Sequence, residues 1–178
     1  MPLSTVLGAQ SVVKPGVCTS STRPASPFDG QVIYETDTNL VKAYNGSAWE
    51  TVNPISAVDS AQVLTSQATS STSYVDLATA GPAVTLTTGT TAIVSVGAAA
   101  SPSVQGPSAA MSFAVSGATT IAASNDYAIF GGNPYVESGS MITKLTTLTP
   151  GSNTFTAKYK ATSGTATFFN RSITVWAI

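Results

Sequence analysis

The feature that most constrains the fold of this chain is a series of short segments, from about residue 71 onward, in which apolar and polar residues alternate. Residues 154–159 show the pattern clearly, with Phe155, Ala157 and Tyr159 set between threonines and a lysine. A period of two is that of a β-strand with one buried face, and no stretch of about ten residues has the helical period. Glycine, proline and asparagine separate the segments, as they do in turns. We therefore predict strands at 73–78, 83–88, 91–97, 110–116, 140–147, 153–160, 164–169 and 171–178. About eight strands at this spacing predict an all-β jelly-roll-like β-sandwich over residues 71–178.

The low charge of the chain narrows the range of partners. Charged residues make up 8% of the 178 residues, against about 25% in an average soluble protein. The net charge is −1, and no Lys or Arg lies between Lys42 and Lys144. A nucleic acid partner is therefore not expected. No apolar run approaches the ~20 residues that span a bilayer, so membrane insertion is not expected either. A chain with so few charges is expected to be assembled with copies of itself or with a larger body.

The first third of the chain differs from the rest and divides into three predicted parts. Residues 1–22 mix a few apolar residues with Ser, Thr, Gly and Pro, and we expect an N-terminal anchoring arm without its own core. Residues 23–52 contain three short strand candidates, with a turn at 36–39 and a type I′ hairpin turn at Asn45-Gly46, which predicts a small N-terminal β-meander. Residues 53–70 are predicted to be a polar linker that has room for a short helix or an opening strand.

One stretch of about 30 residues resembles a known module. The chain runs R-P-A-S-P-F-D-G-Q-V-I-Y-E-T-D-T-N over residues 23–39 and Y-N-G-S-A-W over residues 44–49. This resembles an adaptor module of bacteriophage fibre, tail and head-appendage proteins, in which R-P-x-x-P leads into G-x-x-x-Y-E-T-D-T and ends in Y-x-G-x-x-W. The matching positions, taken as the assembly motif, are Arg23, Pro24, Pro27, Gly30, Tyr34, Asp37, Tyr44, Gly46 and Trp49.

The resemblance implies a structural protein of a phage particle. It implies a homotrimeric head or tail appendage, decoration or adaptor protein that is attached to other virion proteins (capsid, neck or tail) through its N-terminal region. The N-terminus has no basic segment followed by an apolar one, so synthesis in the bacterial host cytoplasm and a final location in the virion are expected. Physically, the two prolines would hold the chain extended. The aromatic residues, Trp49 above all, would provide most of the apolar area of a very small sheet.

The residue inventory argues against an enzyme. The chain has no histidine and one cysteine, Cys18, which excludes His-dependent triads and a thiolate metal cluster. The predicted sandwich contains three carboxylates, Asp76, Asp126 and Glu137, and no motif places two of them together. The D-x-N spacing at Asp37 lacks the glycine and distal glutamate of a calcium loop, so a turn explains it better. No cofactor, metal or catalytic residue is predicted.

One loop in the sandwich leaves a second function open. Tyr127, Phe130 and Tyr135 lie close together in the sequence around Gly131-Gly132. They could form an aromatic platform on which a host surface glycan stacks, as in a receptor-binding fibre tip, or they could pack at a subunit interface. Trp176, in the last predicted strand, points to the opposite face from Val175, and we expect it to be buried between subunits.

Overall fold

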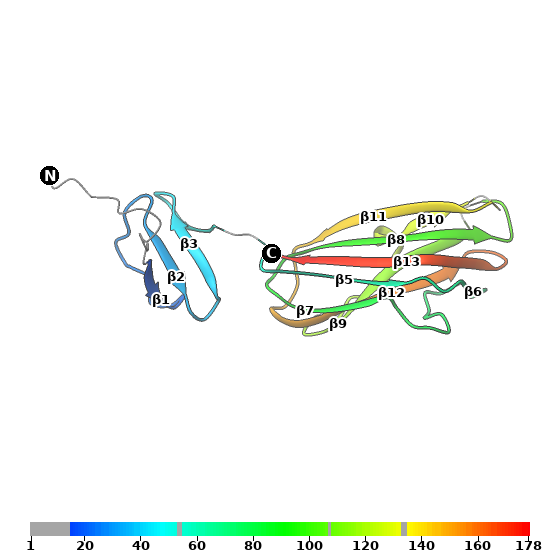
Figure 1. Ribbon diagram of the computed structural model, residues 1–178, viewed down its shortest axis with the longest axis horizontal. Helices are drawn as coiled ribbons and strands as arrows, with labels where there is room; N and C mark the ends of the chain where they lie inside the picture. Colours follow the sequence, from blue (N-terminus) through cyan, green and yellow to red (C-terminus); the bar gives the residue numbers. More distant parts are fainter. Residues whose placement is uncertain (1–14, 53–54, 107, 133–134) are drawn as a thin grey trace, which may run out of the picture. The chain divides into compact units, whose positions relative to one another are not determined.

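The computed structural model describes residues 15–52, 55–106, 108–132 and 135–178 and divides the chain into two compact units, 1–54 and 55–178. Both units are built from β-strands (Figure 1). The prediction of an all-β chain with a β-sandwich is therefore confirmed. The helical structure among the described residues is one 3-10 turn, Asn125–Tyr127, and none of it is long or apolar enough to cross a membrane.

The first unit contains a four-stranded sheet in the order β1-β2-β3-β4. Its strands are β1 (Gly16–Cys18), β2 (Val32–Glu35), β3 (Leu40–Tyr44) and β4 (Trp49–Thr51). The last three form an antiparallel meander, while β1 pairs with β2 in parallel. Among residues 15–52, the buried side chains are those of Ile33 and Glu35. A sheet this small has little core of its own.

Two expectations for this unit were wrong. The predicted arm, 1–22, includes β1, so the small module already begins within it; residues 1–14 lie outside the described part. The segment Gly16–Cys18 has no clear alternation of apolar and polar residues, and it forms strand β1 because it pairs with β2. The turn after β3 is not a two-residue type I′ hairpin, since Tyr44 pairs with Trp49 and four residues lie between them. The Asn45 side chain accepts hydrogen bonds from the backbone N–H groups of residues 47 and 48 at 3.0 and 2.8 Å, which closes the longer loop.

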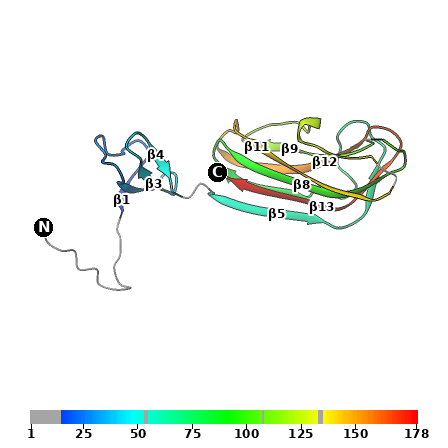
Figure 2. The same cartoon turned by 90° about the horizontal axis from the view of Figure 1, so that it is seen from above.

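The second unit is a sandwich of two sheets, whose layers are seen edge-on in Figure 2. One sheet has the order β11-β8-β13-β5, and the other has the order β10-β9-β12-β7, while the short β6 pairs with β13. The strands are β5 (Ala57–Val63), β6 (Gln67–Thr69), β7 (Ala83–Thr88), β8 (Ala92–Pro102), β9 (Ala109–Gly117), β10 (Ile129–Gly131), β11 (Glu137–Leu145), β12 (Gly151–Ala161) and β13 (Ala166–Ala177).

The strand pairs identify this sandwich as a jelly roll. With β6 set aside, the first of the eight strands pairs with the last, β5 with β13, and the second with the seventh, β7 with β12. The third pairs with the sixth, β8 with β11, and the fourth with the fifth, β9 with β10. This nested pairing is the arrangement of a jelly roll, in which one long antiparallel ribbon is wrapped into two sheets. The apolar core lies between the sheets and includes Phe113, Phe155, Tyr159, Phe168 and Ile173, each no more than 1% exposed.

The second unit differs from the prediction at several places; β8 also extends to Pro102 and β10 was not predicted. The predicted linker, 53–70, contains β5 and β6, so the sandwich begins near residue 57 rather than 71. The predicted strand 73–78 is absent, and Val75 forms only an isolated bridge with Tyr159. The predicted strands 164–169 and 171–178 are one strand, β13, with a register shift between Phe169 and Ser172. The Asn170 backbone there has a positive φ of 51°, which marks a β-bulge inside a continuous strand.

Candidate functional site

An ion pair lies at the centre of the motif region in the N-terminal module. Arg23 Nε donates to Glu35 Oε1, and the Glu35 side chain is fully buried. Thr38 Oγ1 donates to the other carboxylate oxygen at 2.9 Å. The hydrogen bond from Arg23 lowers the pKa of Glu35 against the opposing effect of burial, and the same bond raises the pKa of Arg23. The carboxylate thus remains charged inside the module because both of its oxygens are hydrogen-bonded.

A second contact fastens β1 and the following segment to the β2–β3 loop. The Asp37 carboxylate accepts from the Ser20 backbone N–H at 2.9 and 3.1 Å and from Ser20 Oγ at 2.5 Å. These bonds lower the pKa of Asp37. The backbone N–H of Thr36 donates to the carbonyl of Cys18 at 2.9 Å, next to the same contact. Asp37 is therefore a residue of a loop clamp, as the turn interpretation implied.

The motif aromatics are divided between the two faces of the small sheet. Tyr44 and Trp49 are paired across β3 and β4, with ring centroids 5.4 Å apart, and both are half-buried. Strand alternation and register place them on the same side as Ile33. Tyr34 lies on the opposite side and donates to Asn39 Oδ1 at 2.9 Å. Trp49 is half-buried, and the fully buried positions of the described module are Ile33 and Glu35.

The Tyr34 side of the module is an open apolar sheet face. Tyr34 lies opposite Val17 of strand β1 and opposite Val41 of strand β3. The backbone N–H of Val52 donates to the Val41 carbonyl. Val17, Val41 and Val52 are 62%, 38% and 58% exposed, and Val32 on the same side is 40% exposed. An apolar row thus runs across β1, β2 and β3 to Val52, which follows β4, without a cover in the described chain.

The remaining motif residues shape the backbone. Gly30 and Gly46 have φ angles of +82° and +87°, where a side chain is strained. The Gly30 N–H donates to the Tyr44 carbonyl at 2.8 Å, so this bend fixes the start of β2 beside the end of β3. Pro24 and Pro27 are half-buried in the segment that leads to the bend. The structure therefore gives most motif residues roles inside the module.

The aromatic loop of the jelly roll is only partly assembled as predicted. Tyr127 stacks on Phe113 of the core, with ring centroids 5.4 Å apart, and so is not part of an exposed platform. Phe130 and Tyr135 are 45% and 79% exposed. Val136, next to Tyr135 in the chain, is 60% exposed, and we call these three exposed apolar residues the rim.

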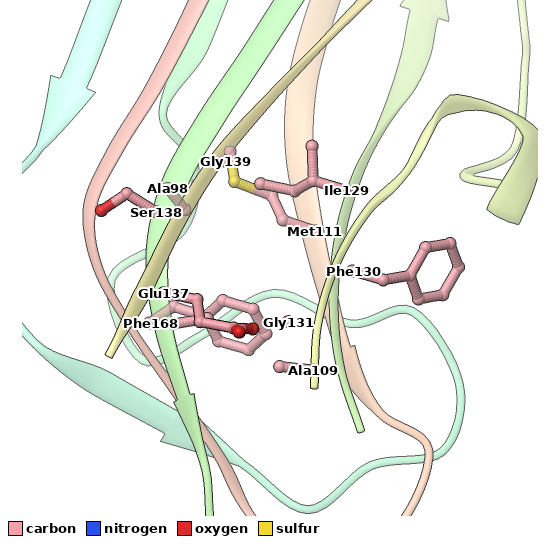
Figure 3. Close-up of a pocket in the computed structure, with 11 residues that line it drawn as sticks. Ala98, Ala109, Met111, Ile129, Phe130, Gly131, Glu137, Ser138, Gly139 and Phe168 are labelled. Carbon is pink, nitrogen blue, oxygen red and sulfur yellow. The ribbon is translucent and has the colours of Figure 1, made fainter. Parts of the chain in front are cut away.

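A cavity of about 280 Å³ lies between the sheets next to this rim. Its walls come from β8 and β11 of one sheet and from β9 and β10 of the other (Figure 3). Small residues such as Ala98, Ala109 and Gly131 leave the space unfilled, while the ring of Phe130 points away from it. Glu137 lies at the cavity and accepts from the Gly132 N–H at 2.9 Å.

A shallower groove of about 480 Å³ lies on the outer side of the β10-β9-β12-β7 sheet. Lys158 and Lys160 of β12 and Tyr74 line it. Lys158 pairs with Asp76 at 2.7 Å, and the Lys160 ammonium lies 4.7 Å from the centre of the Tyr74 ring. Burial raises the pKa of Tyr74 to about 12.

The three carboxylates that the sequence analysis considered in the sandwich each have a polar partner. Asp76 binds Lys158, Asp126 accepts from the Ser124 hydroxyl at 2.9 Å, and Glu137 accepts from a backbone N–H. Within the described ranges, no group of three or more His, Cys, Asp or Glu residues could hold a metal ion.

Sequence reasoning missed two polar centres. Glu35 and Ser20 were not singled out, although Glu35 is part of the matched Y-E-T-D-T segment. Arg171 of β13 is fully buried, lies 5.3 Å from the Tyr159 ring centre, and donates to the carbonyls of Thr65 and Gly81 at 3.2 and 3.4 Å. An arginine in an alternating β segment is the one signal that could have indicated this cross-link.

Comparisons with known proteins give little guidance for this chain. No family model matches the sequence, and no curated protein matches it. Among solved structures, it is similar to one described as the structure of infectious bursal disease virus Gx strain, at 12% identity and a TM-score of 0.47. The match covers 76% of this chain and 36% of that one, so this chain spans little more than a third of the other.

Proposed function

We propose that this chain is a non-enzymatic structural protein of a bacteriophage particle: a homotrimeric head or tail appendage that attaches through its N-terminal region. The observation that carries the proposal is the N-terminal module itself. Its sequence resembles the adaptor module of phage appendage proteins, and its own contacts close it into a separate four-stranded unit. The apolar row on its Tyr34 side gives that unit a surface with which to seat on a larger body.

The jelly roll supports the same proposal in a different way. It has an enclosed apolar core and does not depend on the module for any strand. A self-contained domain joined to a small adhesive module is the organisation that an appendage requires, because the module can bind the particle while the domain projects from it. The few charges of the chain also suit a surface that is covered in an assembly.

Particles produced in the presence of a C-terminally tagged chain provide the test. We expect the tag to co-purify with particles through a density gradient and to be seen by gold labelling at regular positions on the head or tail. Replacing Val41 and Val52 by serine should abolish incorporation, while Val104→Ser, at a position of the jelly roll that is 44% exposed and lies outside its strands, serves as the control. A tagged chain that stays free of particles would overturn the proposal.

A receptor-binding role is the second candidate, and the exposed aromatic rings of the rim, Phe130 and Tyr135, favour it. Exposed aromatic rings are the surfaces on which sugar rings stack. Purified chain should then bind host cell envelopes, and the double replacement of Phe130 and Tyr135 by alanine should abolish that binding. Binding that is unchanged in this double variant would exclude the rim as the receptor site.

A further inference from the structure

The two outer faces of the jelly roll differ in charge. The outer face of the β10-β9-β12-β7 sheet carries Lys158 and Lys160, and Asp76 pairs with the first of them. The segment after β9 also crosses this side, where Ser112 Oγ donates to the Ser124 carbonyl at 2.8 Å. This face is solvated and partly covered by the chain's own residues.

The outer face of the β11-β8-β13-β5 sheet is nearly free of charge. We name it the Trp176 face and define it as the side chains that alternate with the buried ones along these strands. At one end a row crosses all four strands, where Trp176 lies opposite Ile93 on β8 and Val58 on β5, and Ile93 lies opposite Lys144 on β11. Trp176 and Ile93 are half-buried and Val58 is 57% exposed. Among the described residues of this face, Lys144 is the charged one, and it lies on an edge strand.

The two central strands fill the middle of the Trp176 face with small residues. Thr174 lies between Ser95 and Ser60, and Ser172 lies opposite Gly97. On the edge strand β11, Ile142 lies opposite Ser95 and is 66% exposed. Near the other end, Phe169 lies half-buried on the same face. A face with aromatic and aliphatic residues and without charges at its centre has the composition of a protein interface core.

The size of this face fits a copy of the chain. Four strands about 4.8 Å apart make a face about 19 Å wide, and the central strands, at about 3.3 Å per residue, make it about 35 Å long. The resulting area of roughly 700 Å² is close to the ~800 Å² that each partner contributes to a stable interface. The open face of the N-terminal module, with strands of three to five residues, is far smaller. A face with almost no charge also does not repel a copy of itself.

We propose that the Trp176 face packs against other copies of this chain. The inference rests on the self-association that is part of the proposed function, and it assigns that association to one surface. It also gives Trp176 a role, since this large side chain would be enclosed on assembly. The partner is the same chain because the face is large enough for a stable contact and nearly free of charge, so copies arranged around a three-fold axis can bring it together without repulsion.

The test compares two lysine variants of the full chain. Thr174→Lys puts a charge in the middle of the Trp176 face, and Thr156→Lys puts the same charge on the central strand β12, on the outer face of the other sheet. Both threonines are half-buried. Mass is measured by light scattering and sedimentation, with a reductant present because Cys18 is free. The wild type and Thr156→Lys should remain oligomers, whereas Thr174→Lys should have a dissociation constant raised on the order of 100-fold or more.

A further variant guards against misfolding. Ser60→Lys lies on the same face, at an exposed position of the edge strand β5, where a lysine is easily accommodated. It should also dissociate the oligomer and keep the wild-type circular dichroism spectrum. An oligomer that survives both Thr174→Lys and Ser60→Lys would overturn the assignment of the face but leave self-association intact. A wild-type chain that is monomeric would overturn both, and neither result bears on particle attachment, which the gold-labelling experiment tests.

Discussion

The jelly roll encloses an apolar core between two sheets, whereas the N-terminal module buries two side chains, Ile33 and the charged Glu35. In the jelly roll, the alternating side chains of β9, β12 and β13 meet side chains from the opposite sheet. In the module, one side of the sheet is open and the other is fastened by the Arg23–Glu35 pair and the Asp37–Ser20 clamp. Removal of apolar surface from water therefore stabilises one unit, and directed polar contacts stabilise the other.

This difference has a functional consequence. Burial of many side chains gives the jelly roll stability with a large margin against any one exposed substitution. The module has no such margin, so a partner that covers its Tyr34 side would contribute a large fraction of its stability. Coupling of that kind would make the module more stable when it is bound than when it is free, as the attachment role proposed for it requires.

Truncation of the jelly-roll core should produce the largest effect. Phe113 is fully buried and contacts Tyr127 and Phe155, with ring centroids 5.4 and 6.5 Å away. Phe113→Ala should lower the free energy of unfolding of the jelly roll by about 3–5 kcal/mol. The measurement is urea unfolding followed by Trp176 fluorescence in a Trp49→Phe background. Phe130→Ala, at an exposed site, is the control and should change this free energy by less than about 0.5 kcal/mol.

Strands with a clear alternation of apolar and polar residues could be predicted from the sequence, whereas strands that depend on distant pairing could not. Strand β7 was placed at its observed ends, and β12 within two residues at its N-terminal end and one at its C-terminal end, because large apolar residues alternate there with threonine or lysine. Strand β5 was left in the linker. Its inward positions include Ala57 and Asp59, so the strand exists through its pairing with the distant β13, and its own pattern is weak.

The candidate site was predictable to a smaller extent. The motif positions were found by resemblance, but their roles depend on register, which a local pattern does not show. Glu35 is buried because the segment before β2 brings Arg23 over it, across twelve residues of chain. Tyr34 and Tyr44 looked equivalent in the sequence, and only the pairing of β2 with β3 puts them on opposite sides. Tyr127 looked like a loop residue because the 3-10 turn that directs it onto Phe113 has no strand or helix period.

Loss of the buried carboxylate should produce the next largest effect, and in the module alone. Glu35→Ala removes the acceptor of the bonds from Arg23 and Thr38, and hydrogen bonds to charged groups contribute about 1.5–3 kcal/mol. The free energy of unfolding of the module, measured by urea unfolding with Trp49 fluorescence in a Trp176→Phe background, should fall by that amount. The jelly-roll transition should not move. A shift of both transitions would mean that the two units unfold together and would contradict their separate stabilisation.

Truncation of Trp49 should have a smaller effect than the size of the side chain indicates. The ring is half-buried and contacts Tyr44 from one side. Trp49→Ala should therefore cost about 1–2 kcal/mol of module stability, less than half of the value for a tryptophan enclosed in a core. Module unfolding can be followed by protection of its backbone amides from hydrogen exchange, since this variant lacks the fluorescent reporter. A loss as large as that of Phe113→Ala would show that the ring is enclosed in the working chain, as it would be if a partner covered it.

Acid should lower the free energy of unfolding of the module. Near neutral pH this effect is the smallest of those predicted. The hydrogen bond from Arg23 holds the pKa of Glu35 below its ordinary value of 4.5, and Ser20 lowers the pKa of Asp37. The unfolded chain therefore binds protons at these carboxyls at a higher pH than the folded chain. Their contribution to module stability is complete above the unfolded pKa values and is lost as the pH falls through the folded ones.

Module unfolding should thus change little between about pH 7 and pH 5 and should become progressively easier below about pH 4.5. The measurement is urea unfolding followed by Trp49 fluorescence across this range, again with Trp176→Phe. Glu35→Gln should weaken the module at neutral pH, approach the wild type at low pH and remove most of the acid dependence, because a neutral amide cannot take up the proton. Asp37→Asn should remove a further part, because the Ser20 clamp would no longer favour a carboxylate. If Glu35→Gln kept the wild-type acid dependence, the buried ion pair would not be what holds the module together.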